Sequence, residues 1–517
     1  MILTWFIIIL ITGGLLARIA EHWNSWIPKW IALLVSLMAL VLATSLWILN
    51  YDVLQISHSA WLITYILPWI PQFGISFHLA LDGLSLLMLI LTYFLGTLAI
   101  LTSWKEIKYK VGFFYLNILW VLAGITGVFL AMDLFLFYFF WEVMLIPMFF
   151  LIAIWGHENR RYAAYKFFIF TQASGLLMLL AILGLYFIHG SSTDIYTFDY
   201  FQLLGTTLST STGRWLMLGF LSAFIVKLPA VPFHSWLPDA HSEAPTAGSL
   251  ILAGLLLKTG AYGLIRFVIP LFPDASAELA PWMMTLGVIG ILYGAMLAFA
   301  QTDLKRLVAY TSVSHMGFIL LGVFAFNTLA MQGVVMQMIT HGISTGALFI
   351  LAGSVYERIH TRDIMKMGGF WSKAPYMATI GLIFAMASLG LPGLGNFVAE
   401  FLTLVGSWQA APLLTILATT GLVAATAYSL RIVQKVFLGI HQPGLILPDL
   451  SYRERLMLVP MVIVILWLGV FPKAVLKTSE KACVEAEQAV THNLTSRVME
   501  DKPIKESSIH QKGGTHE

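Results

Sequence analysis

The sequence has 517 residues, of which 59% are hydrophobic and 11% are charged, with a formal net charge of +3. Together with a mean hydropathy of +0.85, this composition excludes a soluble globular protein and predicts a polytopic helical membrane protein. A single cysteine, Cys483, excludes an internal disulfide and supplies too few thiolates for an iron–sulfur cluster, and the sequence has no CxxCH haem-attachment motif. The small net charge says little about partners, and we expect none of them to be a nucleic acid.

A window of about 20 residues, the length that crosses a bilayer as a helix, finds roughly fourteen apolar segments. The first stretch, 1–16, lacks a basic n-region and is followed by Arg18 rather than by a small-residue cleavage site, so we expect it to remain as the first helix. The segments lie at 2–17, 30–49, 78–102, 112–131, 134–154, 166–189, 215–232, 246–268, 282–300, 311–327, 332–353, 376–405, 411–438 and 456–476.

Lysine and arginine gather in alternate loops and at their edges, whereas loops 50–77 and 269–281 contain neither, with Arg214 as the exception. The residues concerned are Arg18, Lys29, Lys105, Lys108, Lys110, Arg160, Arg161, Lys166, Lys305, Arg306, Arg358, Arg362, Lys366, Arg431, Lys435, Arg453 and Arg455. By the positive-inside rule, both termini are predicted on the non-cytoplasmic side. The polar stretch 478–517 is predicted to be a mobile tail.

Lys227 interrupts the apolar stretch 221–232 (LSAFIVKLPAVP) and is followed by Pro229 and Pro232. A charge at bilayer depth costs at least ~2.5 kcal/mol and is tolerated mainly inside a bundle or beside a water-filled cavity. The two prolines lack amide hydrogens and should therefore free the carbonyls of Ile225 and Leu228. Because broken helices at the midplane mark ion pathways in transporters, this stretch predicts such a pathway.

Further ionisable residues fall well inside the predicted spans, where charge is expensive and usually functional. They are Glu142, Lys258, His315, His341 and Glu400. For the glutamates and lysines, the alternative is a buried pair that only holds helices together; for the histidines, it is a structural role in an apolar helix. Glycines around Pro392, with Glu400 two turns further on, predict a second broken helix.

The spacing of these residues suggests an internal repeat. Glu142 to Lys227 and His315 to Glu400 are both 85 residues, and Lys227 to Lys258 and Glu400 to Arg431 are both 31. Because an odd number of spans, five, separates the two copies, they would be inverted in the membrane. The predicted order is N-terminal helices at 1–111, five-helix repeats at 112–268 and 282–438, a last span at 456–476 and a polar tail at 478–517.

Six strings of residues resemble a known family. They are LDGLSLLM from Leu81, FFWEVMLIPM from Phe139, KLPAVPFHSWLPDAHSEAPTAGS from Lys227, LLLKTGAYG from Leu255, AQTDLKRLVAYTSVSHMGF from Ala300 and PGLGNFVAEF from Pro392. Together they closely resemble the antiporter-like membrane subunits of bacterial respiratory complex I, the proton-pumping NADH:quinone oxidoreductase. The resemblance covers nearly the whole span region, and a glutamate rather than a lysine at Glu400 favours the subunit M branch of that family.

The resemblance implies an all-α fold of fourteen transmembrane helices with two inverted five-helix repeats. It also implies proton-transfer roles for Glu142, Lys227, Lys258 and Glu400, with His315 and His341 along the polar axis that connects them. No cofactor is expected in this chain, whereas NADH, FMN, iron–sulfur clusters and quinone would bind in other subunits. The implied partners are other membrane subunits, including the antiporter-like L and N subunits, and lipids of the bacterial inner membrane.

These roles suit the physics of buried charges. Burial disfavours the charged forms of lysine and glutamate, and a nearby opposite charge restores them. Movement of Glu142 toward or away from Lys227 is therefore expected to switch the protonation of that lysine. A released proton would then pass to Lys258 and on toward Glu400.

Three alternative interpretations stay open at this stage. The chain could be a subunit of a multisubunit cation/proton antiporter, which sodium transport would favour. It could be a membrane subunit of a hydrogenase complex, which a co-purifying nickel–iron protein would favour. It could also be a non-transporting scaffold whose charges merely clamp helices together, in which case pumping would survive the removal of those charges.

Overall fold

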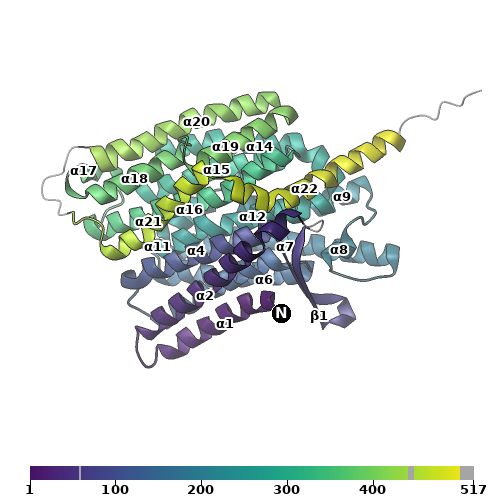
Figure 1. Ribbon diagram of the computed structural model, residues 1–517, viewed down its shortest axis with the longest axis horizontal. Helices are drawn as coiled ribbons and strands as arrows, with labels where there is room; N and C mark the ends of the chain where they lie inside the picture. The colour runs from purple at the N-terminus through teal and green to yellow at the C-terminus, as the bar shows by residue number, and fades with distance from the viewer. Residues whose placement is uncertain (57–59, 440–446, 501–517) are drawn as a thin grey trace, which may run out of the picture.

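A computed structural model of the protein describes residues 1–56, 60–439 and 447–500 (Figure 1), and the chain within these limits is predominantly helical. The N-terminal part holds two long helices, a short one, a β-hairpin and a fourth helix. Their bounds are α1 (Ile2–Ala20), α2 (Ile27–Leu49), α3 (Tyr51–Ile56), β1 (Trp61–Ile70), η1 (Pro71–Phe73), β2 (Ile75–Asp82) and α4 (Gly83–Glu106).

The next group of helices leads up to and past Lys227. The bounds are α5 (Val111–Leu130), α6 (Leu134–Trp155), α7 (Arg160–Thr193), α8 (Tyr200–Leu203), α9 (Thr210–Lys227) and α10 (Trp236–Glu243). A single long element then runs as α11 (Thr246–Ile251), η2 (Leu252–Leu256), α12 (Leu257–Gly263), η3 (Leu264–Val268) and α13 (Ile269–Leu271). The η2 and η3 segments are π-helical, a form that often occurs at functional sites.

The C-terminal group contains the second predicted break. Its bounds are α14 (Pro273–Ala300), α15 (Leu304–Val323), α16 (Thr328–Ile359), η4 (Ile364–Lys366), α17 (Phe370–Lys373), α18 (Pro375–Ser388), α19 (Gly395–Ala410), α20 (Pro412–Ile432), η5 (Val433–Leu438), α21 (Tyr452–Val470) and α22 (Lys473–Glu500).

The hairpin of β1 and β2 corrects one predicted span. The two strands pair in antiparallel fashion, so residues 78–82 of the predicted span 78–102 belong to a strand. The helix begins only at Gly83, where the side chain of Asp82 accepts a hydrogen bond from the Ser85 amide at 2.8 Å. Gly74, with a φ of +67°, supplies the left-handed residue between the strands.

Both predicted helix breaks are present. Helix α9 ends at Lys227 and α10 begins at Trp236, while α18 ends at Ser388 and α19 begins at Gly395. In the second break, Gly390 and Gly393 adopt φ values of +77° and +93°, a conformation that glycine adopts without strain.

One detail of the first break differs from the expectation. The carbonyl of Ile225 is not free, because it accepts a hydrogen bond from the Ala230 amide at 2.9 Å. The turn that follows Lys227 therefore satisfies this backbone group within the chain, as membrane depth requires.

The described residues hold eleven helices that are long and apolar enough to cross a membrane, or twelve if the bent pair α21 and α22 forms one span. Three of the fourteen predicted spans account for the difference. Predicted span 215–232 is the 18-residue helix α9, predicted span 376–405 is divided between α18 and α19, and predicted span 456–476 bends by 70° between α21 and α22. The number fourteen stays a prediction.

The predicted mobile tail is wrong for residues 478–500, which belong to helix α22. This helix, drawn in yellow in Figure 1, packs against α4, α14 and α16. Its buried side chains include those of Val475, Ser479, Ala482, Ala486 and Val490, whose spacing of three or four residues places them on one helical face. Residues 501–517 of the predicted tail lie outside the described residues.

Small residues let the helices approach one another closely, as is common in membrane proteins. Helices α14 and α15 are the clearest case. A Cβ atom on Gly287 would lie 2.8 Å from the carbonyl oxygen of Gly317, and one on Gly317 would lie 2.5 Å from that of Gly287. Any larger residue at either position would push the two helices apart.

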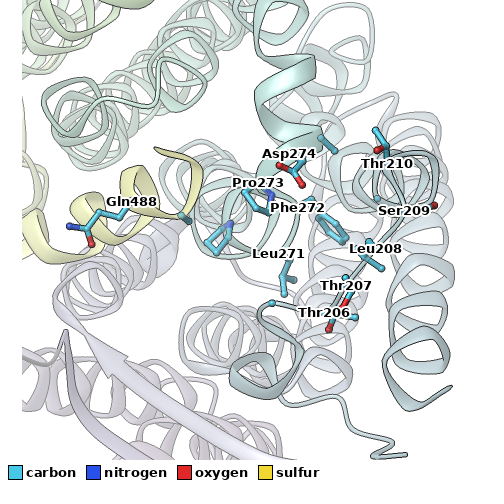
Figure 2. A pocket seen from close by; sticks show the side chains of 15 residues that line it. Thr206, Thr207, Leu208, Ser209, Thr210, Leu271, Phe272, Pro273, Asp274 and Gln488 are labelled. Atoms are coloured by element: carbon cyan, nitrogen blue, oxygen red, sulfur yellow. The ribbon is translucent and has the colours of Figure 1, made fainter. Parts of the chain in front are cut away.

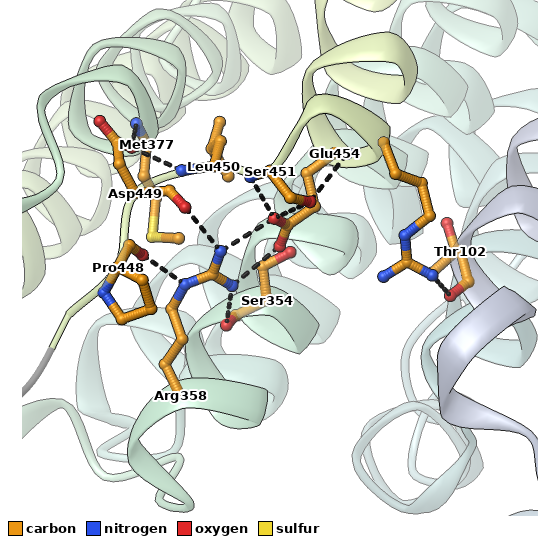
Figure 3. Close-up of polar contacts among 10 residues, drawn as sticks. Thr102, Ser354, Arg358, Met377, Pro448, Asp449, Leu450, Ser451 and Glu454 are labelled. Atoms are coloured by element: carbon orange, nitrogen blue, oxygen red, sulfur yellow. Dashed lines mark hydrogen bonds and ion pairs between the residues drawn. The ribbon is translucent and has the colours of Figure 1, made fainter.

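A buried ion pair holds α21 against α16, as Figure 3 shows. The two terminal nitrogens of Arg358 each lie 2.8 Å from an oxygen of Glu454, and Nε of Arg358 donates to the carbonyl of Pro448 at 2.7 Å. Glu454 also closes a capping box with Ser451 at the start of α21. This bidentate geometry fixes the segment that enters the last helix pair.

Candidate functional site

Four of the six predicted site residues form a continuous buried row of contacts. The Nζ atom of Lys258 lies 2.7 Å from Nδ1 of His341, and the rings of His341 and His315 have centroids 5.5 Å apart. Nδ1 of His315 in turn lies 3.0 Å from Oε1 of Glu400. All four side chains are at most 3% exposed. The row therefore links three separate helices, α12, α16 and α15, to the second broken helix at α19.

The π-helical segment η2 positions Lys258. Nζ of Lys258 donates to the carbonyl of Ala253 at 2.5 Å, five residues earlier in the chain. A protonated lysine only donates hydrogen bonds, so Nδ1 of His341 must then accept and its ring proton must sit on Nε2. That Nε2 atom is buried and has no hydrogen-bond partner among the described residues.

The neighbours of His315 are compatible with Nδ1 being either protonated or unprotonated. Its Nδ1 atom faces both Oε1 of Glu400 and the amide nitrogen of Gln337, the latter at 3.3 Å. An ionised Glu400 requires Nδ1 to donate, whereas the Gln337 amide requires it to accept. On the other side of the ring, Nε2 lies 3.3 Å from both Ser388 and Tyr428. A proton can therefore move between His315 and Glu400 while partners remain on both sides.

Glu400 also borders a cavity, although its side chain is only 3% exposed. It lines a cavity of about 290 Å³ whose walls are mostly apolar, formed by residues of α19, α20 and the break between α18 and α19. Oε2 of Glu400 is directed at Gly390, where an added Cβ would lie 2.7 Å from it. The end of the row at Glu400 thus has access to space outside the packed core.

Lys227 is buried to 1% exposure at the C-terminal end of α9. Its Nζ atom has no hydrogen-bond partner among the described residues. It lies 4.9 Å from the ring centroid of Trp141 and 5.7 Å from that of Phe167. These aromatic faces attract a cation but accept no strong hydrogen bond, so the charge of Lys227 is only weakly compensated.

The structure does not bring Glu142 into contact with Lys227, whose Nζ atom has no hydrogen-bond partner among the described residues. Glu142 is half-buried on α6, and its Oε1 atom accepts a hydrogen bond of 3.4 Å from Gln172 of α7. The adjacent residue, Trp141, is the one that faces Lys227. The two ionisable groups therefore act on each other through space rather than by contact.

Lys227 and Lys258 lie on adjacent elements. Helix α9 packs on α12 at Gly260, where an added Cβ would lie 2.7 Å from the carbonyl oxygen of Phe224 and 3.1 Å from the amide of Leu228. This glycine lets the end of α9 that carries Lys227 approach the element that carries Lys258. No hydrogen bond joins the two lysines within the described part of the chain.

Sequence reasoning missed several buried polar residues. Gln337, Ser388 and Tyr428 surround His315, and no charge marks them in the sequence. His241 stacks on Phe349 at 4.7 Å with neither ring nitrogen bonded among the described residues. In the sequence, the feature that points to His241 is its place in the family-like string KLPAVPFHSWLPDAHSEAPTAGS, which starts at Lys227.

Two buried charges missed in the sequence had a usable signal. Arg266 and Asp82 form a buried ion pair, and both lie inside predicted spans, so the rule that charge at membrane depth is significant could have found them. Lys305, taken from the sequence as a loop-edge charge, is instead only 1% exposed, and its Nζ donates to the Ala244 carbonyl at 3.0 Å.

The cavity in Figure 2 is separate from this row. It has a volume of about 500 Å³ and lies between the loop that precedes α9 and the junction of α13 with α14, with Gln488 of α22 at one side. Thr206, Thr207, Ser209 and Thr210 are among its lining residues, and none of the six predicted site residues is. In the described residues, no group of three or more His, Cys, Asp or Glu side chains could hold a metal ion.

A broken helical membrane bundle crossed by a row of buried ionisable side chains is a fold typical of ion-translocating membrane subunits. Residues 131–426 match the family described as NADH:quinone oxidoreductase/Mrp antiporter, TM. NADH-quinone oxidoreductase subunit M of Pseudomonas aeruginosa is 56% identical over 490 residues, covering 93% of this chain and 96% of the relative. The Escherichia coli K12 subunit M is 53% identical over 506 residues, covering 96% and 99%. The chain therefore belongs to the family of NADH-quinone oxidoreductase subunit M.

Solved structures agree with this assignment. A chain of respiratory complex I from Thermus thermophilus with bound NADH superposes with a TM-score of 0.85 at 32% identity, covering 94% of this chain and 99% of that one. A chain of the Mrp complex from a Dietzia species superposes with a TM-score of 0.83 at 21% identity, covering 95% and 98%. The second likeness concerns the fold alone, so the subunit M assignment is the better supported.

Proposed function

We propose that this chain moves protons across the membrane along Lys227, Lys258, His341, His315 and Glu400, with Glu142 acting on Lys227 through its charge. The observation that carries the proposal is the unbroken series of contacts from Lys258 through both histidines to Glu400. As a member of the subunit M family, the chain is an antiporter-like membrane subunit of an NADH-quinone oxidoreductase. The driving reaction, quinone reduction, takes place in other subunits, which also hold the redox cofactors.

The energies involved are compatible with electrostatic coupling. Moving one proton against about 150 mV requires roughly 3.5 kcal/mol. A change of about 2.5 units in the pKa of a relay group corresponds to a similar free energy. Because Lys227 lacks a hydrogen-bonded counterion among the described residues, we expect its protonation to respond to changes in the nearby electric field.

We place the chain in a bacterial inner membrane, beside the antiporter-like L and N subunits and in contact with lipids. The support is its membership of a family whose bacterial members are subunits of a multisubunit membrane complex.

We also propose that residues 112–268 and 282–438 are inverted repeats. Two features support this. Each segment contains one helix break. Each also contains π-helical backbone near a basic residue: η2 and η3 lie on either side of Lys258 in the first segment, and η5 follows Arg431 in the second. Inverted repeats of this kind place the ion site near the bilayer midplane.

Purification of the intact assembly from native membranes tests the function directly. We expect the chain to co-purify with a flavin-containing NADH dehydrogenase module, and vesicles containing the assembly to acidify one side when NADH and quinone are supplied. Co-purification with a nickel–iron protein would contradict the proposal. So would NADH-independent sodium–proton exchange by an assembly that lacks flavin.

Topology gives a separate expected result. Both termini should face the periplasm, because lysine and arginine gather in the alternate loops that would then be cytoplasmic. A reporter fused after Glu517 should therefore give the signal of periplasmic location, and one inserted near Arg362 should give the cytoplasmic signal. Matching signals at the two positions would show that the number of spans between them is wrong by one.

A further inference from the structure

A basic cavity of about 890 Å³ lies between the loop that precedes α7 and the loop that follows α16. Arg160, Arg161 and Arg362 line it together with His157 and His360, while Glu158 is the acidic residue in the lining. It lies at loops rich in lysine and arginine, which the charge distribution assigns to the cytoplasmic side. None of the six proton-relay residues contributes to it.

Two of the three arginines are available to a ligand. Nε of Arg362 lies 3.0 Å from a carboxylate oxygen of Asp303, and Nη2 lies 3.6 Å from one of Glu243, so much of its charge is compensated. Arg160 and Arg161 are exposed, and within the described residues neither has an ion-pair partner. The hydrogen bond that Arg160 makes is to the Gly156 carbonyl at 3.2 Å.

His157 is kept neutral first by burial and then by nearby cations. Burial, together with the cations of Lys305 and Arg362, lowers the pKa of His157 to about 3. The imidazole is therefore neutral at pH 7 and adds no charge. A cavity in which nearby cations help to keep a histidine unprotonated disfavours positive ligands and favours an anion.

The surface beside the cavity matches a lipid rather than a small anion. Tyr162 and Tyr165 of α7 are 62% and 58% exposed, as expected of tyrosines at the level of the headgroups. Exposed apolar side chains continue down α7 through Ile169, Leu180 and Phe187. They offer a surface for acyl chains directly below the arginines.

We propose that this cavity binds the phosphate group of an anionic phospholipid whose acyl chains lie along α7. Arginine suits this role because its planar guanidinium binds phosphate oxygens in pairs, and basic pockets on the cytoplasmic side of helical membrane proteins are suited to such headgroups. The cavity contains none of the proposed proton-transfer residues. A negative result for lipid binding would therefore leave the proposed function unaffected, and the reverse also holds.

The test uses the intact complex in nanodiscs that contain phosphatidylglycerol with a photoreactive group on one acyl chain. Mass spectrometry of the digested chain measures labelling of the peptides from α7. In Arg160→Gln/Arg161→Gln, we expect this labelling to fall by roughly tenfold or more, since each basic residue near a membrane surface contributes on the order of 1 kcal/mol. Arg160→Lys/Arg161→Lys retains the charge and should keep most of the labelling.

Lys108→Gln/Lys110→Gln is the matched control, because it removes two exposed positive charges from the same side of the chain outside the cavity. It should label like the unaltered protein. Two results would overturn the proposal with the unaltered complex alone. One is equal labelling by a phosphatidylcholine probe. The other is loss of labelling when millimolar inorganic phosphate is added, which would show that soluble phosphate occupies the cavity. Undiminished labelling of the glutamine variant would also overturn it.

Discussion

Lys227→Ala should leave the complex assembled but reduce NADH-driven proton pumping by at least about tenfold, since a positioned proton-transfer group typically contributes about 10²-fold or more. The reason is the environment of Lys227: its Nζ atom is buried, faces the rings of Trp141 and Phe167, and has no hydrogen-bond partner among the described residues. The measurement is the proton gradient in inverted vesicles, together with NADH:quinone turnover and the amount of assembled complex.

Lys227→Arg separates proton transfer from structure. Arginine keeps the positive charge and can still lie against the Trp141 ring, but in proteins it does not release its proton. If Lys227 is a relay group, the arginine variant should pump as poorly as the alanine variant. If the cation only clamps α9 against α6 and α7, the arginine variant should pump normally, and the relay would then not pass through Lys227.

Glu142 should show the same dependence on charge. Glu142→Ala is expected to reduce pumping strongly, whereas Glu142→Asp keeps a carboxyl one methylene shorter and should give a milder defect. Because Nζ of Lys227 has no hydrogen-bond partner among the described residues, Glu142 would act on it through the electric field, which changes gradually with distance. Equal activity of Glu142→Ala and the unaltered complex would remove Glu142 from the mechanism.

Glu400→Gln is the second substitution with a large expected effect. The glutamine keeps the size of the side chain and can still accept a hydrogen bond from Nδ1 of His315, which lies 3.0 Å from Oε1 in the structure. It cannot take up or release a proton at pH 7. We therefore expect normal assembly and a loss of pumping of about tenfold or more, in line with the removal of a proton-transfer group.

Two further variants define what the loss means. Glu400→Lys restores a group that can titrate when buried, so partial pumping is expected if the complex assembles. Tyr428→Phe is the control, because it removes a 3.3 Å contact with Nε2 of His315 but no relay proton, and it should pump at nearly the normal rate. Normal pumping by Glu400→Gln, combined with failure of Glu400→Lys to assemble, would make Glu400 a packing residue.

The class of protein and most of the buried ionisable residues could be predicted from the sequence. Composition and the length of apolar runs reveal membrane helices because the bilayer selects for both. A charge within such a run, as at Lys227, Lys258 or Glu400, stands out because hydrocarbon makes it expensive. Prolines and glycines in these runs located both helix breaks, since their backbone effects are local.

Segments whose structure depends on distant neighbours are harder to predict from the sequence. Residues 478–500 have a polar average and were expected to be mobile, yet α22 buries one face against α4, α14 and α16. The pairing of β1 with β2 was missed for a similar reason. In both cases the deciding energy comes from contacts with distant parts of the chain, which an average over a window does not contain.

Which of these groups lie in contact depends on how the helices pack. Lys258 and His341 are 83 residues apart in the chain, and His315 and Glu400 are 85 apart, so no local pattern relates them. The structure also placed Trp141 rather than Glu142 against Lys227. Neighbouring residues on a helix point about 100° apart, and the rotation of α6 is set by how its side chains pack against α5 and α7. The rotation of a helix about its axis decides which of two adjacent side chains enters the site. Because this rotation results from the packing of many side chains together, it cannot be read from the local sequence.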